Sequence, residues 1–226
     1  QLPVVAPSAN TSGRPSPTTA LHVKEDMAGR IPLILDGGPC AIGLEATVLD
    51  ITSDKPMILR PGAVTREMLQ QVVGDVRLDP GISLKSSAVP KAPGMKYKHY
   101  APVGELVLLE GTPDRVRAMM EEKVAESLEK GYKTGMLITA EMQVHYFQGH
   151  IPAAVQVEIL GSREQPDQIA ANLFRALRSF DEGGCQSIYG EALPRDGVGE
   201  AIMNRLCKAA AGRIIQADIA GKVEQR

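Results

Sequence analysis

Hydroxyl and amide side chains that could bind a small anion gather near the start of the chain, between Ser8 and Thr18. The segment follows a short apolar run and leads into a predicted helix, with Ser16 as its N-cap and Pro17 at its first position. Loops before helix N-termini favour anions, because free backbone N–H groups and the helix dipole face the ligand. Ser8, Asn10 and Thr18 are therefore candidates to bind a phosphate, a ribose or a carboxylate. The alternative is that Ser8 and Asn10 satisfy only the polar groups of their own turn.

A second candidate is Arg60, which follows the predicted strand Met57–Leu59 and precedes a Pro-Gly turn. Ligands of α/β proteins collect at strand ends, and a guanidinium held there suits a phosphate or a carboxylate. Pairing with Glu45 or Asp50 is an equally good interpretation of the same residue.

Other motifs are weaker. The glycine-rich turn from Arg195 to Gly199 precedes a predicted helix and could hold an anion, although many helix starts have this composition. Neither a dinucleotide-binding glycine motif nor a P-loop occurs. The four histidines lack the spacing of zinc enzymes, and the three cysteines lie too far apart to form a metal set. No metal site made by the protein alone is expected.

The chain that carries these candidate residues divides into three zones. Residues 1–79 alternate short strands and helices, and Thr65 is predicted to cap an amphipathic helix that Gly74 ends. The predicted strands of this zone are Val4–Ala6, Ile31–Asp36, Thr47–Ile51 and Met57–Leu59. Residues 80–102 form a proline-rich linker without periodicity. Four large or aromatic side chains within six of its residues favour docking onto the protein: Met95, Tyr97, His99 and Tyr100.

Residues 103–226 repeat strand and helix, which predicts an α/β fold with a parallel, doubly wound sheet. The predicted strands are Leu106–Leu109, Thr134–Thr139, Ala154–Leu160 and Ser187–Tyr189. Helices are predicted over residues 113–130 and 166–181 and from Gly197 to Ala211.

Composition limits the class of protein. The 226 residues carry 25 Lys and Arg against 27 Asp and Glu, for a net charge of −2 and a pI near 6.1. This balance, with no Trp and 4% aromatic residues, argues against a nucleic-acid reader. We find neither an apolar run of the roughly 20 residues that span a membrane nor a secretory leader, and the separated cysteines favour a reducing, cytoplasmic location. The chain opens at Gln1 within an apolar run, which suggests that it begins inside a domain.

Five ordered segments together resemble the threonylcarbamoyl-AMP synthase family, and in particular its long, two-domain members. They are PSAN-x-SG-x-PSPT (residues 7–18), DGG (36–38), GLEATV (43–48), LRPG (59–62) and PGMKYKHYAP (93–102). The resemblance covers essentially the whole chain. It implies that residues 1–79 are the C-terminal portion of a YrdC-like α/β twisted-sheet domain. Residues 80–102 would then be a linker that acts as a lid, and residues 103–226 a Rossmann-like parallel-sheet domain.

The resemblance also implies an activity. The family makes threonylcarbamoyl-AMP and diphosphate from L-threonine, bicarbonate and ATP, with Mg²⁺ accompanying the ATP. The product serves the tRNA threonylcarbamoyladenosine modification, so the expected protein partners are the downstream tRNA threonylcarbamoyl-transfer proteins. Stable binding to nucleic acid or to a membrane is not expected. A basic nucleotide-binding stretch precedes these motifs in the family, and we therefore expect the 226-residue chain to be inactive alone.

Individual site residues follow from the matched motifs. The positions that match threonine contacts are Ser8 and Ala46, and those that match ATP contacts are Asn10, Thr18, Arg60 and Tyr100, with Tyr97 an alternative to Tyr100. The family usually has a serine at Ala46, so a hydroxyl is absent here, and Thr47 or water would have to replace it. The rival interpretation is a non-catalytic α/β module that binds a small effector or a partner in tRNA modification.

Overall fold

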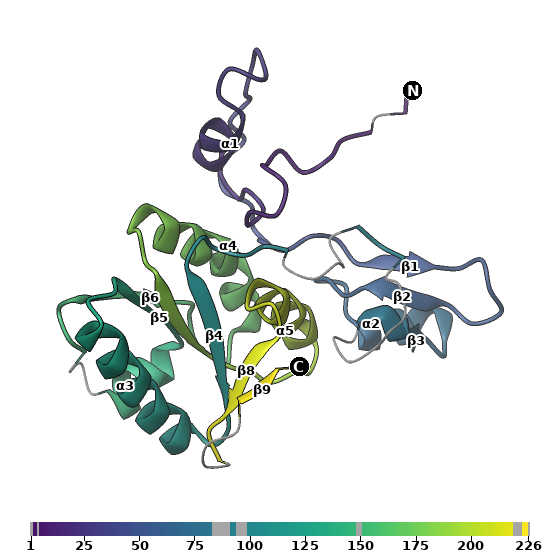
Figure 1. Ribbon diagram of the computed structural model, residues 1–226. Coiled ribbons are helices and arrows are strands. Elements are labelled where there is room, and N and C mark those ends of the chain that lie inside the picture. Colours follow the sequence, from purple (N-terminus) through teal and green to yellow (C-terminus); the bar gives the residue numbers. More distant parts are fainter. Residues whose placement is uncertain are drawn as a thin grey trace.

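The computed structural model describes residues 2–3, 5–82, 91–93, 99–147, 151–218 and 223–225. A C-terminal α/β part and a smaller sheet with one helix lie side by side, and an N-terminal segment that carries a single helix extends away from them (Figure 1). Among the described residues, no helix is long and apolar enough to cross a membrane.

The C-terminal part is built on a six-stranded sheet in the order β6-β5-β7-β4-β8-β9. Neighbouring strands are parallel except β8 and β9, which are antiparallel. The strands are β4 (Glu105–Glu110), β5 (Thr134–Ile138), β6 (Val155–Ile159), β7 (Ser187–Glu191), β8 (Arg213–Gln216) and β9 (Val223–Gln225). The helices are α3 (Pro113–Glu129), α4 (Pro166–Glu182) and α5 (Val198–Ala209), and a π-helical turn, η2, spans Met142–Tyr146.

Helices cover both faces of this sheet, which confirms the predicted α/β architecture. Leu106 and Leu108 of β4 join the core beneath α4 and α5, whereas Leu109 of the same strand joins the core beneath α3. Successive side chains of a strand point to opposite faces, so one apolar run supplies both cores. The sequence did not predict β8 and β9, because Arg213–Gln216 offers only two apolar residues and Val223–Gln225 only one.

The smaller sheet has the order β1-β2-β3, with β1 antiparallel and β3 parallel to β2. Its strands are β1 (Val48–Asp50), β2 (Met57–Arg60) and β3 (Arg77–Leu78), followed by a 3₁₀ turn, η1 (Pro80–Ile82). Helix α2 (Arg66–Val73) lies between β2 and β3. The strands predicted at Thr47–Ile51 and Met57–Leu59 are thus confirmed. The helix after Thr65 is confirmed too, with the Thr65 side chain accepting from the Met68 N–H.

The strands predicted nearer the start of the chain are wrong. Ile31–Asp36 forms no strand, and its Leu33 and Leu35 side chains are 69% and 85% exposed. Val5 and Ala6 also lie outside any strand, and Val4 lies outside the described residues. A strand needs partners for its backbone N–H and C=O groups, and none of the described residues pairs with Ile31–Asp36.

The first helix, α1 (Ala20–Met27), begins three residues later than predicted. Thr19 is its N-cap, and the Thr19 side chain accepts a hydrogen bond from the backbone N–H of His22. The hydroxyl of Ser16, the predicted cap, instead donates to the Glu45 carboxylate at 2.5 Å. Ser16 is therefore used for a tertiary contact and not for capping.

The described part of the linker docks onto the protein, as expected. The Tyr100 ring is 1% exposed and stacks on Phe174 of α4, with 5.2 Å between ring centroids. The Ala101 N–H donates to the carbonyl of Gly13 at 3.2 Å, and the N–H of Val103, the residue that follows the linker, donates to Asp181 at 2.7 Å. Met95 and Tyr97 lie outside the described residues, and the division of the chain at residues 79 and 102 stays a prediction.

Candidate substrate-binding site

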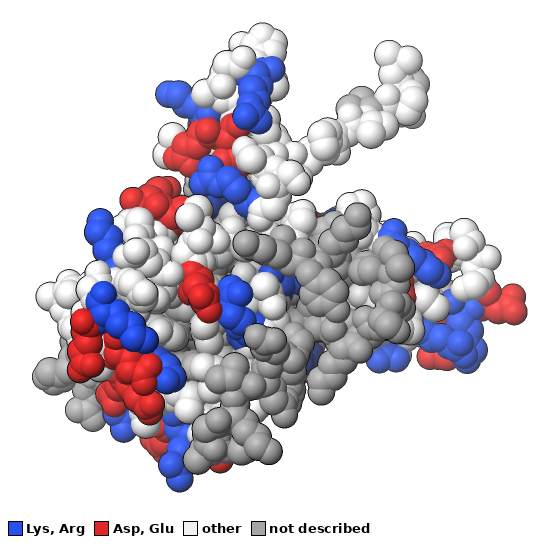
Figure 2. Space-filling model, viewed as in Figure 1, with Lys and Arg blue, Asp and Glu red and all other residues white. Residues whose placement is uncertain are grey.

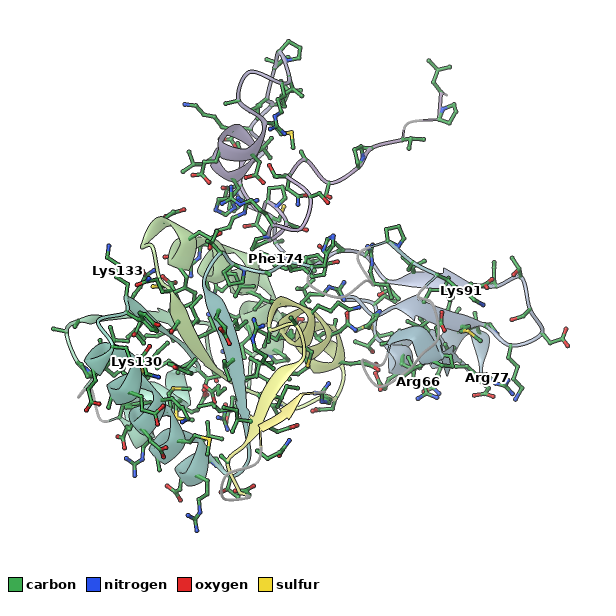
Figure 3. All side chains as sticks on the ribbon, viewed as in Figure 1. Arg66, Arg77, Lys91, Lys130, Lys133 and Phe174 are labelled. Carbon is green, nitrogen blue, oxygen red and sulfur yellow. The ribbon has the colours of Figure 1, made fainter. Side chains whose placement is uncertain are left out.

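A cavity of about 470 Å³ lies where the N-terminal segment meets α4. Three parts of the chain line it: the loop before α1, the segment from Cys40 to Glu45, and Phe174 of α4. Figure 3 places Phe174 at this junction. The cavity brings together two of the predicted site residues, Ser8 and Thr18.

The segment that forms the second wall is pressed directly against α4. Gly43 has φ +72°, and a Cβ there would lie 2.5 Å from the Cα of Ala171 and 2.6 Å from the carbonyl oxygen of Ala170. Only glycine permits both this conformation and this approach. The first glycine of the GLEATV motif therefore fixes the distance between the cavity wall and the C-terminal part.

The loop before α1 is held by its own hydrogen bonds. The Asn10 amide nitrogen donates to the carbonyls of Thr11 and Arg14, at 3.0 and 3.2 Å, which agrees with the turn-satisfying interpretation of Asn10. Its Oδ1 is buried and has no hydrogen-bond partner in the described part of the chain. The Thr18 N–H donates to His22 Nδ1 at 3.2 Å, and burial lowers the pKa of His22, so the neutral ring that accepts this bond is favoured.

Asp26 anchors the same loop to the C-terminal part. Its buried carboxylate is bound by Arg178 of α4 at 2.7 and 3.2 Å, by Arg14 at 2.8 Å and by the Thr11 N–H at 3.1 Å. Burial alone would raise the pKa of Asp26. Hydrogen bonds from Arg178 and Thr11, and the charges of the two arginines, outweigh burial and hold the pKa below its usual value. The Asp26 carboxylate is thus kept ionised.

Arg60 lies outside the cavity lining. Its Nε donates to the carbonyl of Ala46 and its Nη1 to the carbonyl of Pro93, both at 3.1 Å. The suggested pairing with Glu45 or Asp50 is not found. Glu45 instead binds Ser16 and Arg205, and Asp50 accepts from Thr52.

The GLEATV motif contributes through its glutamate. Ala46 is exposed and does not line the cavity, whereas Glu45, one residue earlier, does. The Thr47 hydroxyl donates to the carbonyl of Val64 at 2.7 Å. Thr47 is therefore already engaged and is not a ready substitute for the hydroxyl that Ala46 lacks.

Tyr100 lies behind the cavity wall, against Phe174, and not on the cavity surface. Burial raises the pKa of its phenol to about 12, so the group stays neutral. Its backbone φ of +64° is uncommon for a residue other than glycine and indicates local strain. That Tyr100 covers a nucleotide stays a prediction, and in this arrangement it requires the ring to leave the core.

Sequence reasoning missed four residues that build the site: Glu45, Phe174, Asp26 and Arg205. Glu45 stands inside a motif and carried a signal. The other three contribute through contacts between segments 100 residues or more apart, which no local pattern reveals. In the part of the chain that the structure describes, no group of three His, Cys, Asp or Glu side chains could hold a metal ion.

Comparisons with known proteins agree with this arrangement. Residues 1–62 match the family model described as "Telomere recombination", and residues 64–211 match "Threonylcarbamoyl-AMP synthase, C-terminal domain". The threonylcarbamoyl-AMP synthase of Bacillus subtilis is 46% identical over 95% of this chain and 59% of its own length. That of Pyrococcus abyssi is 44% identical over 96% of this chain and 60% of its own length.

The fold and the cavity define a two-part α/β protein whose candidate site lies between its parts. A crystal structure of Pyrococcus abyssi Sua5 complexed with L-threonine has the same arrangement, with a TM-score of 0.82 and 44% identity over 93% of this chain and 58% of that one. The chain belongs to the threonylcarbamoyl-AMP synthase family. It spans about 60% of the length of the curated relatives it matches.

Proposed function

We propose that the protein takes part in forming threonylcarbamoyl-AMP and diphosphate from L-threonine, bicarbonate and ATP. The observation that carries the proposal is the convergence of Ser8, Thr18 and Glu45, from two matched motifs, on one cavity. The identity of 44–46% to two proteins named threonylcarbamoyl-AMP synthase supports it. The product would pass to tRNA threonylcarbamoyl-transfer proteins.

The proposed chemistry needs positioning more than acid–base groups. The amine of threonine attacks the carbon of bicarbonate, a C–N bond forms, and water leaves to give a carbamate. A carbamate oxygen then attacks the α-phosphorus of ATP, and the bond to diphosphate breaks. Holding the reactants close and offsetting the charge that builds on the phosphates accelerates both steps.

Residue roles within this scheme are proposals. We assign Ser8, on the cavity wall, and the backbone near Ala46 to threonine. Asn10, Thr18 and Arg60 are assigned to ATP, where the buried Oδ1 of Asn10 is a free acceptor and Arg60 stabilises the phosphates. Mg²⁺ would arrive bound to ATP and neutralise phosphate charge; we assign it no protein ligand.

Diphosphate release tests the activity, with ATP, L-threonine and bicarbonate each omitted in turn. Two proteins should be compared: the 226-residue chain, and a chimera in which this chain replaces the matching 59% of the Bacillus subtilis protein. We expect the chimera to need all three substrates and the chain alone to be inactive. A folded but inactive chimera would refute the synthase proposal and favour the binding-module interpretation.

We also propose a cytoplasmic location. Cys40, Cys185 and Cys207 are all free thiols, and burial raises the pKa of the latter two, which keeps them protonated and unreactive. Free thiols are typical of a reducing compartment. Finding the protein in another compartment by fractionation would contradict this.

A further inference from the structure

Arg205 of α5 lies at a junction of three segments that come from the other part of the protein. Its side chain is fully buried. Its Nε donates to the Glu45 carboxylate at 3.0 Å and its Nη1 to the carbonyl of Pro61 at 2.7 Å, and its guanidinium carbon lies 5.8 Å from the centre of the Tyr100 ring. One residue of the C-terminal part thus touches the GLEATV, LRPG and linker motifs.

A chain of hydrogen bonds leads from Arg205 to the cavity. Glu45 Oε2 is bound by Arg205, and Glu45 Oε1 accepts from the Ser16 hydroxyl at 2.5 Å. Glu45 and Ser16 both line the cavity, from two different walls. With both carboxylate oxygens engaged, the Glu45 side chain and the loop that carries Ser16 are held in one orientation.

The ion pair between Arg205 and Glu45 is an inefficient way to stabilise the fold, because burying its charges costs desolvation free energy. The Arg205 side chain is 0% exposed and the Glu45 side chain 16%. A pair buried to this degree adds little net stability unless its geometry is excellent, and apolar replacements of buried pairs are often neutral or stabilising. One nitrogen of Arg205, Nη2, also has no hydrogen-bond partner among the described residues. An expensive and incompletely satisfied arginine suits a positioning role better than a purely structural one.

We propose that Arg205 is a positioning residue through which the C-terminal part sets the affinity of the cavity for L-threonine. The proposal rests on the proposed function. The two residues that match threonine contacts, Ser8 and Ala46, flank the Glu45–Ser16 pair: Ser8 lines the same cavity and Ala46 follows Glu45 in the chain. Loss of the Arg205 contact frees Glu45 and Ser16, and the cavity then holds threonine less tightly.

The test compares Arg205→Lys with a matched control, Arg163→Lys, in the active chimera. Lysine keeps the charge but loses the planar fork that reaches Glu45 and Pro61 together. Arg163 also pairs with a buried glutamate, Glu191 of β7, but neither residue lines the cavity. We expect Arg205→Lys to raise KM for L-threonine roughly 10-fold or more. KM for ATP should rise by a smaller factor, because Arg205 also binds the carbonyl of Pro61, next to Arg60. Arg163→Lys should leave both KM values unchanged.

A second measurement separates positioning from general destabilisation. If Arg205 acts through Glu45, adding Arg205→Lys to Glu45→Gln should raise KM for threonine no further. An additive increase, or a lowered melting temperature with an unchanged KM for threonine, would overturn the proposal.

Failure of the proposed synthase function can be distinguished from failure of the Arg205 proposal. In that case the unaltered chimera makes no product, and calorimetric binding of L-threonine to the 226-residue chain replaces the kinetic readout. Weaker binding by Arg205→Lys than by Arg163→Lys would still support the inference. Equal binding by the two variants, or no binding by the unaltered chain, would overturn it.

Discussion

The two parts of the molecule treat similar apolar residues differently. In residues 103–218 the large aliphatic side chains of the sheet and of α4 and α5 are almost all buried, in two cores on either side of the sheet. In residues 5–82, Leu35 is 85% exposed and Val72 of α2 is 83% exposed, and α2 has no buried residue at all. The difference shows that an apolar pattern becomes part of a packed core only where a second apolar surface covers it.

Residues 5–82 are attached to the C-terminal part by buried polar contacts, together with Leu44, which packs on the C-terminal core. Asp26 is bound by Arg178 and Glu45 by Arg205, and both arginines are fully or almost fully buried. The charges visible on the surface are arranged differently: on the face shown, Lys and Arg lie next to Asp and Glu over α3 and over the smaller sheet (Figure 2). Such exposed pairs contribute little, whereas the buried ones decide whether the N-terminal segment stays on α4.

The largest effect is therefore expected from Asp26→Ala. Removing one partner of a buried ion pair costs about 3–5 kcal/mol, and the molecule can limit this cost by releasing residues 5–46 from α4. Limited proteolysis and hydrogen exchange should show residues 5–46 exposed while residues 103–218 stay protected. Asp75→Ala is the matched control, because it removes the carboxylate of an exposed pair with Lys55 and should cost at most about 1 kcal/mol.

The same contact should depend on pH. The pKa of Asp26 is depressed in the folded protein, so its stabilisation is fully present above the unfolded value of about 3.9. It is lost as the pH falls from there through the folded-state pKa. Release of residues 5–46 at a pH well above 4 would contradict this assignment.

The contrast between the parts also explains why the predicted elements are correct in one part and partly wrong in the other. Every strand and helix predicted in residues 103–226 is present. Each of these apolar runs packs against another apolar element of the same part. The strand predicted at Ile31–Asp36 is wrong for the opposite reason. Of the predicted site residues, Ser8 and Thr18 line the cavity, and their binding roles stay predictions. The sequence did not point to Phe174 or Arg205, since their contacts depend on packing between distant segments.

A matched pair of leucines measures the difference in core packing. Leu173→Ala in α4 empties a fully buried position and should cost about 2–5 kcal/mol. Leu35→Ala removes an 85% exposed side chain and should change the free energy of unfolding by no more than about 0.5 kcal/mol. Urea denaturation of the 226-residue chain gives both values. Equal costs would show that Leu35 is packed in solution.

Arg60→Ala tests the chemistry of the first part. If Arg60 binds a phosphate of ATP, losing this charge-assisted contact costs about 1.5–3 kcal/mol, or roughly a 10- to 100-fold fall in kcat/KM for ATP in the chimera. Arg66→Ala is the control, because Arg66 also lies in the smaller α/β part (Figure 3) and its Nε likewise donates to a backbone carbonyl, that of Val76. If Arg60→Ala and Arg66→Ala lower kcat/KM for ATP equally, Arg60 has only a structural role, through its contacts with the carbonyls of Ala46 and Pro93.

The smallest effect concerns helix caps. The Thr65 side chain caps α2, an eight-residue helix with no buried residue, so Thr65→Ala should cost about 1 kcal/mol and increase hydrogen exchange throughout Arg66–Val73. Thr112 stands at the same position before α3, but its hydroxyl binds Asp218 and makes no cap. Because α3 is 17 residues long and packs on the sheet, Thr112→Ala should leave exchange within Pro113–Glu129 unchanged. If α2 stays protected without its cap, contacts beyond those described must cover its exposed apolar face, and the contrast between the two parts would be smaller than the structure indicates.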